Sequence, residues 1–211
     1  MVTTNPGLTS GAGSFAVLVE ILDGGEALKN IGVLALQGDF EAHVQAVRRA
    51  GARPIEVRTA VDLESCDGLI IPGGESTTML KLIALEGLFE PLRAFGERKP
   101  IFGTCAGAIL LANEVFSPSQ PSLGLMDIAV ERNAYGRQVE SRIARIEAAG
   151  KEMEAVFIRA PIIRSVGPEV KVIASYQGTP VWIEHGKHMV TTFHPELGTN
   201  AYVHRCFAEK L

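Results

Sequence analysis

Cys105 lies in a run of small residues, Gly103-Thr-Cys-Ala-Gly107, between an apolar segment and an apolar helical pattern. Glycines two positions before and two after the cysteine permit a sharp strand-to-helix turn that pushes the side chain out above a sheet. At a helix N-terminus the positive end of the dipole favours the thiolate, which is the nucleophilic form. Free cysteines are more often buried and inert, but the flanking glycines favour a nucleophile. The backbone N–H of Ala106 would then be free to donate to an oxyanion.

His194-Pro195-Glu196 supplies the two further groups that a cysteine nucleophile needs. Pro195 disfavours the αR region for the residue before it, so we expect His194 to be extended. Residues i and i+2 of an extended chain project to the same side, so Glu196 can reach the imidazole. A carboxylate on one ring nitrogen leaves the other to take a proton from a thiol. By itself the tripeptide is more typical of an ordinary turn; together with Cys105 it predicts a catalytic triad.

A third turn, Pro72-Gly73-Gly74-Glu75-Ser76, follows another apolar run. Two glycines at the carboxyl end of a strand let the backbone approach a ligand and aim an N–H at it. Ligands of open α/β sheets bind at the carboxyl ends of strands, where this turn and Cys105 both lie. A Gly-Gly pair is a weak signal alone, because the chain has 22 glycines.

The segments around these turns alternate between apolar strand patterns and amphipathic helix patterns. We expect strands at Ile31–Leu36, Pro54–Val57, Gly68–Ile71 and Pro100–Gly103, and helices from Phe40 to near Gly51, at Ser76–Leu85 and at Ala106–Asn113. Asp39 is expected to cap the first helix. Continuous apolar runs joined to helices by short turns predict an α/β fold with a parallel sheet covered on both faces.

After Pro118 strand patterns dominate. We expect strands at Leu125–Glu131, Gln138–Ile146, Ala155–Ile158, Val170–Tyr176, Val181–Glu184 and Met189–Phe193, and a terminal helix from about Asn200 to Leu211. With no repeat or low-complexity tract, we expect one α/β domain with a β-rich second half.

The composition excludes several classes of protein. The chain has 211 residues, 46% hydrophobic and 21% charged, as in an ordinary globular domain. The net charge is −4 and no Lys/Arg cluster stands out, so we expect no binding to nucleic acid or to a membrane surface. No apolar run is long enough to span a bilayer. Three cysteines without a CxxC pair indicate a reducing compartment, and we expect a cytoplasmic protein.

No metal site or cofactor is expected. His185 and His188 flank an expected hairpin turn, but the two further ligands that a metal would need are not evident. The chain carries no phosphate-binding or dinucleotide-binding fingerprint. Cys66 and Cys206 are expected to be inert, and Gln37 is placed to support the Gly73-Gly74 turn.

The three turns together resemble the class I, triad-type glutamine amidotransferases. The matching stretches are Pro72-Gly-Gly-Glu-Ser-Thr-Thr-Met79, Gly103-Thr-Cys-Ala-Gly107 and Phe193-His-Pro-Glu-Leu197. Two further stretches, Val130-Glu-Arg-Asn-Ala-Tyr-Gly-Arg-Gln138 and Val156-Phe-Ile-Arg-Ala-Pro161, narrow the resemblance to the glutaminase subunits of pyridoxal 5′-phosphate synthase. The resemblance covers residues 31 to 211. It implies a three-layer class I amidotransferase-like fold with a mostly parallel central sheet.

The resemblance implies hydrolysis of L-glutamine to glutamate, with ammonia passed to a separate (β/α)₈-barrel synthase subunit that makes pyridoxal 5′-phosphate. Carried over by motif, Cys105 is the nucleophile, His194 the general base and acid, and Glu196 its orienting group. The N–H groups of Gly74 and Ala106 form the oxyanion hole. The residues implied to bind glutamine are Gly74, Glu75, Ser76, Arg132, Ile158 and Arg159.

Three alternatives remain open on the sequence. A stand-alone cysteine hydrolase of γ-glutamyl substrates shares the turn and the triad but needs no partner. The glutaminase subunit of another amidotransferase would carry the same triad. A non-catalytic binding module is also compatible with the fold, although three intact triad residues argue against it.

Residues 1–29 are expected to form an extension outside a catalytic domain at 30–211. The first 28 residues contain no Lys or Arg, which signal and transit peptides require, and Gly7–Ser14 is rich in small residues. The family that the chain resembles starts only a few residues before Ile31.

Deleting residues 1–29 is therefore predicted to leave glutamine hydrolysis and partner binding largely unchanged, because no motif residue lies there. Glutamate release and the thermal unfolding midpoint of the full-length and truncated chains check this. A collapse of stability or of complex formation would show that Phe15–Leu22 is an integral element.

Overall fold

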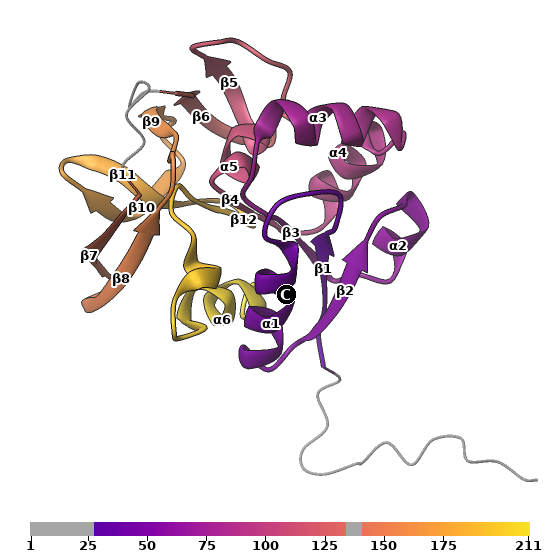
Figure 1. Cartoon of the computed structure of the whole chain (residues 1–211), viewed down its shortest axis with the longest axis horizontal. Coiled ribbons are helices and arrows are strands. Elements are labelled where there is room, and N and C mark those ends of the chain that lie inside the picture. Colours follow the sequence, from indigo (N-terminus) through magenta and orange to yellow (C-terminus); the bar gives the residue numbers. More distant parts are fainter. Residues whose placement is uncertain (1–27, 134–140) are drawn as a thin grey trace, which may run out of the picture.

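The computed structural model of the chain describes residues 28–133 and 141–211 (Figure 1). The expectations about residues 1–27 and about the segment from Gln138 to Glu140 lie outside the described residues. Strands and helices alternate from Asn30 onward, and strands dominate after Leu111. The order of elements confirms the expected α/β class with a β-rich second half.

A seven-stranded sheet forms the centre of the molecule, in the order β10-β11-β12-β4-β3-β1-β2. Its strands are β1 (Asn30–Leu34), β2 (Arg53–Val57), β3 (Gly68–Ile71), β4 (Ile101–Thr104), β10 (Val170–Tyr176), β11 (Thr179–His185) and β12 (His188–Thr191). The pairs from β2 to β12 are parallel, whereas β11 and β10 add on antiparallel. The mostly parallel sheet is the expected one.

Helices cover both faces of this sheet. The helices α1 (Phe40–Arg49) and α6 (Tyr202–Ala208) lie on one face, and α3 (Ser76–Leu85), α4 (Phe89–Arg98) and α5 (Ala106–Leu111) lie on the other (Figure 1). The short helix α2 (Ala60–Glu64) lies beside the edge strand β2. The resulting three layers match the expected architecture.

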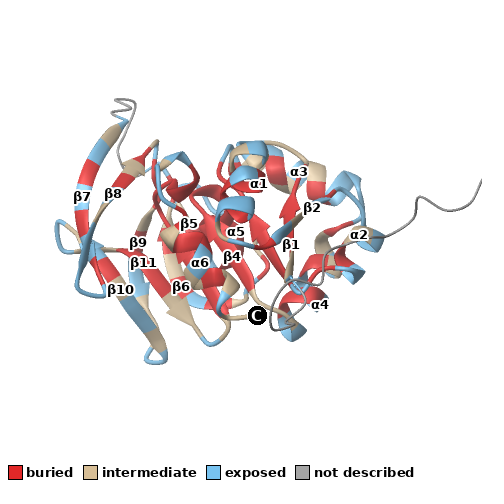
Figure 2. Cartoon of the chain, turned by 90° about the horizontal axis from the view of Figure 1, so that it is seen from below, coloured by how far each residue is buried: buried red, intermediate tan, exposed pale blue. Residues whose placement is uncertain are grey.

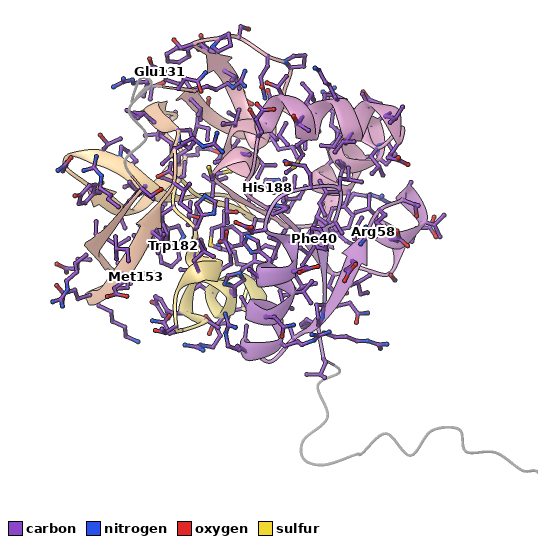
Figure 3. The ribbon with its side chains drawn as sticks, in the orientation of Figure 1. Phe40, Arg58, Glu131, Met153, Trp182 and His188 are labelled. Atoms are coloured by element: carbon purple, nitrogen blue, oxygen red, sulfur yellow. The ribbon has the colours of Figure 1, made fainter. Side chains whose placement is uncertain are left out.

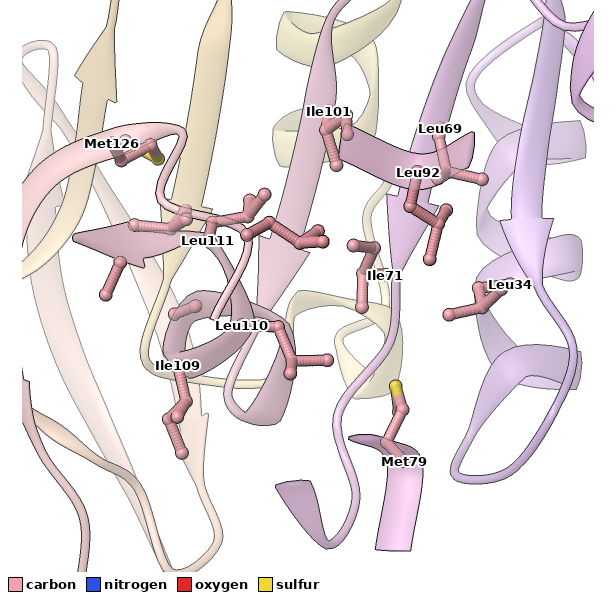
Figure 4. Packing of buried hydrophobic residues seen from close by; sticks show 14 of the residues in the cluster. Leu34, Leu69, Ile71, Met79, Leu92, Ile101, Ile109, Leu110, Leu111 and Met126 are labelled. Carbon is pink, nitrogen blue, oxygen red and sulfur yellow. The ribbon is translucent and has the colours of Figure 1, made fainter. Parts of the chain in front are cut away.

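The interior contains two hydrophobic cores, one on each face of the central sheet, because successive side chains of a strand point to opposite faces. Leu69 and Ile71 of β3 pack with Met79 of α3 and Leu92 of α4 (Figure 4). The intervening Ile70 belongs to the other core, under α1 and α6. In that second core, the ring of Trp182 packs edge-on against Tyr202 of α6, with centroids 6.0 Å apart (Figure 3).

The β-rich half adds two smaller sheets beside β10 to β12. One sheet contains β5 (Ala112–Phe116), β6 (Met126–Glu131) and β9 (Ile162–Val166), and a hairpin joins β7 (Arg142–Ala148) to β8 (Lys151–Phe157). Exposed residues are frequent along β7 and β10, whereas β1, β4 and α5 are mostly buried (Figure 2). The buried β4–α5 junction therefore lies inside the three-layer body.

Several expected boundaries are wrong. The helix expected at Ala106–Asn113 ends at Leu111, because Ala112 enters β5 and pairs with β6. The sequence patterns also missed α2, α4, β5 and β9, and β12 ends at Thr191 rather than at Phe193. Asp39 stands at the N-cap position of α1 but its side chain makes no capping hydrogen bond. The strands β5 and β9 both depend on pairing with β6, and local patterns do not contain that pairing. Helix α2 did carry a local signal, because Asp62 accepts a hydrogen bond from the N–H of Thr59 as in a capping box.

In the part of the chain that the structure describes, no helix combines the length and the apolar character that a membrane crossing requires.

The unexpected helix α4 gives a test of the core. Leu92 of α4 is fully buried, whereas Leu85 at the end of α3 is 79% exposed. We predict that Leu92→Ala lowers the free energy of unfolding by about 2–5 kcal/mol, because it removes buried methyl groups and leaves a cavity. The matched control Leu85→Ala should change it by less than about 0.5 kcal/mol. Urea unfolding measures both, and equal effects would contradict the packing of α4.

Candidate active site

Cys105 occupies a strained turn between β4 and α5. Its backbone has φ 47° and ψ −100°, a left-handed φ that residues other than glycine seldom adopt. A Cβ on Gly103 would lie 2.6 Å from the backbone of Gly107, and a Cβ on Gly107 would lie 2.2 Å from the carbonyl oxygen of Ile71. Side chains at either glycine would therefore push the strand and the helix apart. The small residues are required for this turn, as the sequence predicts.

His194 and Glu196 form a buried hydrogen-bonded pair. Nδ1 of His194 lies 2.7 Å from Oε1 of Glu196, and each residue is only 4% exposed. The expected contact is present, but its expected cause is wrong: residues Pro195–Leu197 form a 3-10 helix rather than extended chain. Proline suits the first position of a helical turn, since its φ is already helical and its missing N–H would have no acceptor there.

The imidazole of His194 faces the thiol of Cys105. Burial lowers the pKa of His194, but its interactions with the nearby Cys105 and with Glu196 outweigh burial and raise the pKa. Nε2 of His194 is buried and makes no hydrogen bond of ordinary geometry to another described residue. Cys105 itself is 5% exposed, and its Sγ lies 3.8 Å from the carbonyl oxygen of Ile158. This arrangement suits proton exchange between thiol and imidazole.

The Gly73-Gly74 turn lies against the same imidazole. A Cβ on Gly73 would come within 2.4 Å of Cε1 of His194, so only glycine lets the turn approach this closely. Gly74 has φ +136°, a region that side chains rarely tolerate. Its N–H donates to no other described residue. Ala106 is the first residue of α5, so its N–H has no acceptor within that helix.

The loop after β1 supports this turn from behind. A Cβ on Gly38 would lie 2.0 Å from the carbonyl oxygen of Gly73, and the side chain of Gln37 contacts Gly74. Nε2 of Gln37 also donates to the carbonyl oxygen of Glu75 at 3.3 Å. The supporting position expected for Gln37 is therefore present.

Glu75 uses its carboxylate to cap α3. The carboxylate accepts hydrogen bonds from the backbone N–H groups of Thr77 and Thr78 at 3.0 and 2.6 Å, and from the Thr78 hydroxyl at 2.7 Å. Burial alone would raise the pKa of Glu75, but the bonds from Thr78 and Thr77 lower it to about 2. The carboxylate is therefore charged at neutral pH.

Arg132 reaches the same helix start from the β-rich half. Its Nη2 donates to the Thr77 hydroxyl at 2.7 Å and lies 3.5 Å from Oε1 of Glu75. The residue is 7% exposed, unusually buried for an arginine. The structure thus brings Arg132 against Glu75 and Thr77 at the start of α3, although 55 residues or more separate them in the sequence.

Ile158 and Arg159 both follow β8, but of the two only Ile158 is hydrogen-bonded to Cys105. The carbonyl oxygen of Ile158 accepts from the Cys105 thiol at 3.8 Å. Arg159 is exposed, has φ 45°, and makes no hydrogen bond or ion pair to another residue that the structure describes. Its guanidinium is therefore available to a ligand carboxylate.

His43 of α1 also belongs to this site, and the sequence reasoning missed it. It is fully buried and its Nε2 lies 3.3 Å from Oε2 of Glu196, on the side opposite His194. The signal was present, because His43 falls on the apolar stripe of α1, three residues after Phe40 and four before Val47. A histidine on such a stripe must find polar partners in the interior.

The remaining titratable candidates have structural partners. Asp39, His194 and Glu196 bring potential metal ligands within 4.8 Å of one another, but the last two are already engaged with each other. His188 accepts from the N–H of Ile101 inside the sheet (Figure 3), and burial is the main reason that its pKa falls to about 4. His185 accepts from the N–H of Asp127.

The two other cysteines have raised thiol pKa values, mainly through burial. The pKa of Cys66 rises to about 11, and that of Cys206 also rises. Neither thiol favours the nucleophilic thiolate at neutral pH.

Solved structures share this fold. A protein described as glutamine amidotransferase is 46% identical, with a TM-score of 0.81 over 85% of this chain and 97% of its own. A putative GMP synthase subunit from Thermoplasma acidophilum is only 17% identical but has a TM-score of 0.65, which shows the fold alone.

Comparison of sequences identifies the family as well as the fold. A protein from Solibacter usitatus, named pyridoxal 5′-phosphate synthase subunit PdxT, is 57% identical over 87% of this chain and 100% of its own length. A protein of the same name from Koribacter versatilis is 54% identical over 84% of this chain and 93% of its own. The model of the SNO glutamine amidotransferase family matches residues 33–211. The chain therefore belongs to the SNO glutamine amidotransferase family.

Proposed function

We propose that this chain is the glutaminase subunit of a pyridoxal 5′-phosphate synthase. It hydrolyses L-glutamine to L-glutamate and ammonia and delivers the ammonia to a separate synthase subunit for vitamin B6 biosynthesis. One observation carries the assignment: a strained cysteine turn faces a buried His194–Glu196 pair, in a chain that belongs to a glutamine amidotransferase family. The names of the relatives supply the pathway.

The chemistry proceeds through a thioester. The Cys105 thiol gives its proton to His194 and attacks the side-chain amide carbon of glutamine. The N–H groups of Gly74 and Ala106 stabilise the resulting oxyanion. His194 then protonates the leaving nitrogen, and ammonia departs. Water, deprotonated by His194, attacks the thioester and releases glutamate and the free thiol, while Glu196 holds the imidazole in one orientation.

Recognition of glutamine combines a cation with backbone groups. The α-carboxylate needs a positive partner, and the exposed guanidinium of Arg159 is available at the end of β8. The α-ammonium needs acceptors, which the Ile158 carbonyl and the Glu75 region offer. Arg132 is held by Thr77 and Glu75, which supports a role in shaping the Gly74-Glu75-Ser76 turn.

The ammonia acceptor lies on another polypeptide. We expect it to be a (β/α)₈ barrel that makes pyridoxal 5′-phosphate from a pentose phosphate, a triose phosphate and ammonia, as the family resemblance implies. A reduced cysteine nucleophile suits the cytoplasm. We further propose that residues 30–211 form the catalytic domain and that residues 1–29 lie outside it, which the family match over 33–211 supports.

The nucleophile gives the first test of this function. Cys105→Ala should reduce glutamine hydrolysis by several orders of magnitude, because no covalent intermediate can form, and should leave the thermal unfolding midpoint nearly unchanged. Cys206→Ala is the matched control and should keep full activity. Glutamate release by the complex with the synthase measures both, and near-normal ammonia release by Cys105→Ala would refute the thioester mechanism.

Dependence on the partner gives the second test. A flip of the Gly73-Gly74 peptide would replace an N–H donor by a carbonyl, and the loss of one oxyanion donor costs on the order of 10²–10³ in rate. We predict weak glutaminase activity for the isolated chain and a marked rise as the synthase is titrated at saturating glutamine. A rate that is high from the start and flat across the titration would favour a stand-alone γ-glutamyl hydrolase.

A further inference from the structure

Beyond the triad, a chain of buried imidazoles extends from Glu196 into the core under α1 and α6. Oε2 of Glu196 faces Nε2 of His43 at 3.3 Å, and Nδ1 of His43 lies 3.0 Å from Nε2 of His204 in α6. His43 is fully buried and His204 is 1% exposed. Nε2 of His43 forms its hydrogen bond with the hydroxyl of Thr104, the residue before the nucleophile, at 3.1 Å. Oε2 of Glu196 lies close to the same nitrogen but has no hydrogen bond of ordinary geometry to a described residue.

The protonation of His43 follows from its neighbours. Burial, together with the nearby His204 and His194, holds the pKa of His43 well below its usual value, so the ring is neutral and carries one N–H. Burial likewise lowers the pKa of His204 to about 3. Each ring therefore has one donor nitrogen and one acceptor nitrogen.

Two arrangements of these protons are possible, and the carboxylate decides between them. With the proton on Nδ1, the bare Nε2 lone pair of His43 would face the carboxylate oxygen of Glu196, which can only accept. With the proton on Nε2, His43 donates to the Thr104 hydroxyl with the same N–H facing Oε2 of Glu196, and its Nδ1 accepts from the Nε2–H of His204. The second arrangement also leaves Nδ1 of His204, which has no partner among the described residues, without a proton that would need an acceptor.

We propose that His43 is a positioning residue of the glutaminase triad: held as its Nε2–H tautomer by His204, it presents this N–H to the Thr104 hydroxyl and to Oε2 of Glu196, and so favours the carboxylate orientation that holds His194. The proposal rests on the proposed function. His43 does not touch substrate; it acts through Glu196. An N–H dipole 3.3 Å from Oε2 favours the orientation in which Oε1 accepts from His194, and without it the carboxylate is freer to rotate away from the imidazole.

The tautomer is tested first, on the isolated wild-type chain. Nitrogen-15 spectra of the histidine rings distinguish protonated from bare ring nitrogens. We expect His43 and His204 to carry their protons on Nε2 with bare Nδ1 atoms at pH 7. Protonation of His43 on Nδ1, in a neutral or a charged ring, would overturn the proposal. This measurement needs neither glutamine nor the partner, so it stays informative if the proposed function fails.

Two substitutions of His43 then distinguish a role in positioning Glu196 from a contribution to core packing alone. His43→Leu removes the donor at similar volume, whereas His43→Gln retains an amide N–H near the position of Nε2. In the complex with the synthase, we expect His43→Leu to lower kcat for glutamine by about 10- to 100-fold with little change in KM. His43→Gln should recover most of that loss. His185→Leu, in the β11–β12 hairpin, is the matched control and should leave kcat unchanged.

Failure of the positioning role and failure of the proposed function give different results. Equal loss of kcat in the Leu and Gln variants, or unchanged kcat in folded His43→Leu, would overturn the positioning role. Thermal unfolding of each variant shows which proteins are folded. If His43→Leu does not fold, the tautomer of the wild type and the activity of His43→Gln still decide the proposal. A wild-type complex that releases no glutamate would instead refute the proposed function.

Discussion

The Glu196 carboxylate is only 4% exposed, and a buried charge is tolerated only where hydrogen-bond donors and positive partners surround it. His194 lies 2.7 Å from one oxygen and His43 lies 3.3 Å from the other. Satisfying this group requires elements from three parts of the chain: the 3-10 turn after β12, helix α1 and, through His204, helix α6. The full set of contacts around Glu196 therefore requires α1 and α6 to be packed on the sheet.

Backbone strain at Cys105 is the second constraint. Its φ of 47° is maintained because β4 and α5 are both buried and because Gly103 and Gly107 let them approach closely. Residues in such conformations persist only where the surrounding packing determines them. The two hydrophobic cores thus hold the thiol in a fixed position. It faces the imidazole of His194, which Glu196 holds by a hydrogen bond on the other ring nitrogen.

The parallel sheet brings these parts together. The Gly73-Gly74 turn follows β3, Cys105 follows β4, and His194 follows β12, and these three strands are neighbours in the sheet. Parallel strands end at the same edge, so their following turns meet there. β12 pairs with β4 although about 85 residues separate them in the sequence. The intervening residues form β11, β10 and the two smaller sheets, none of which lies between the three strands that carry the site.

Much of this arrangement could be predicted from the sequence, and particular residues show where prediction ended. Apolar runs and turn residues located most strands, the glycines around Cys105 indicated the turn, and the spacing of His194 and Glu196 indicated their contact. These features depend on local sterics, which a short stretch of residues contains. Only the tertiary structure decided that Ala112 leaves a helix for a strand, that Arg132 binds the start of α3, and that His43 and His204 line up behind Glu196. Those outcomes depend on contacts between residues up to 161 positions apart, and such contacts are set by the packing of whole layers rather than by any local pattern.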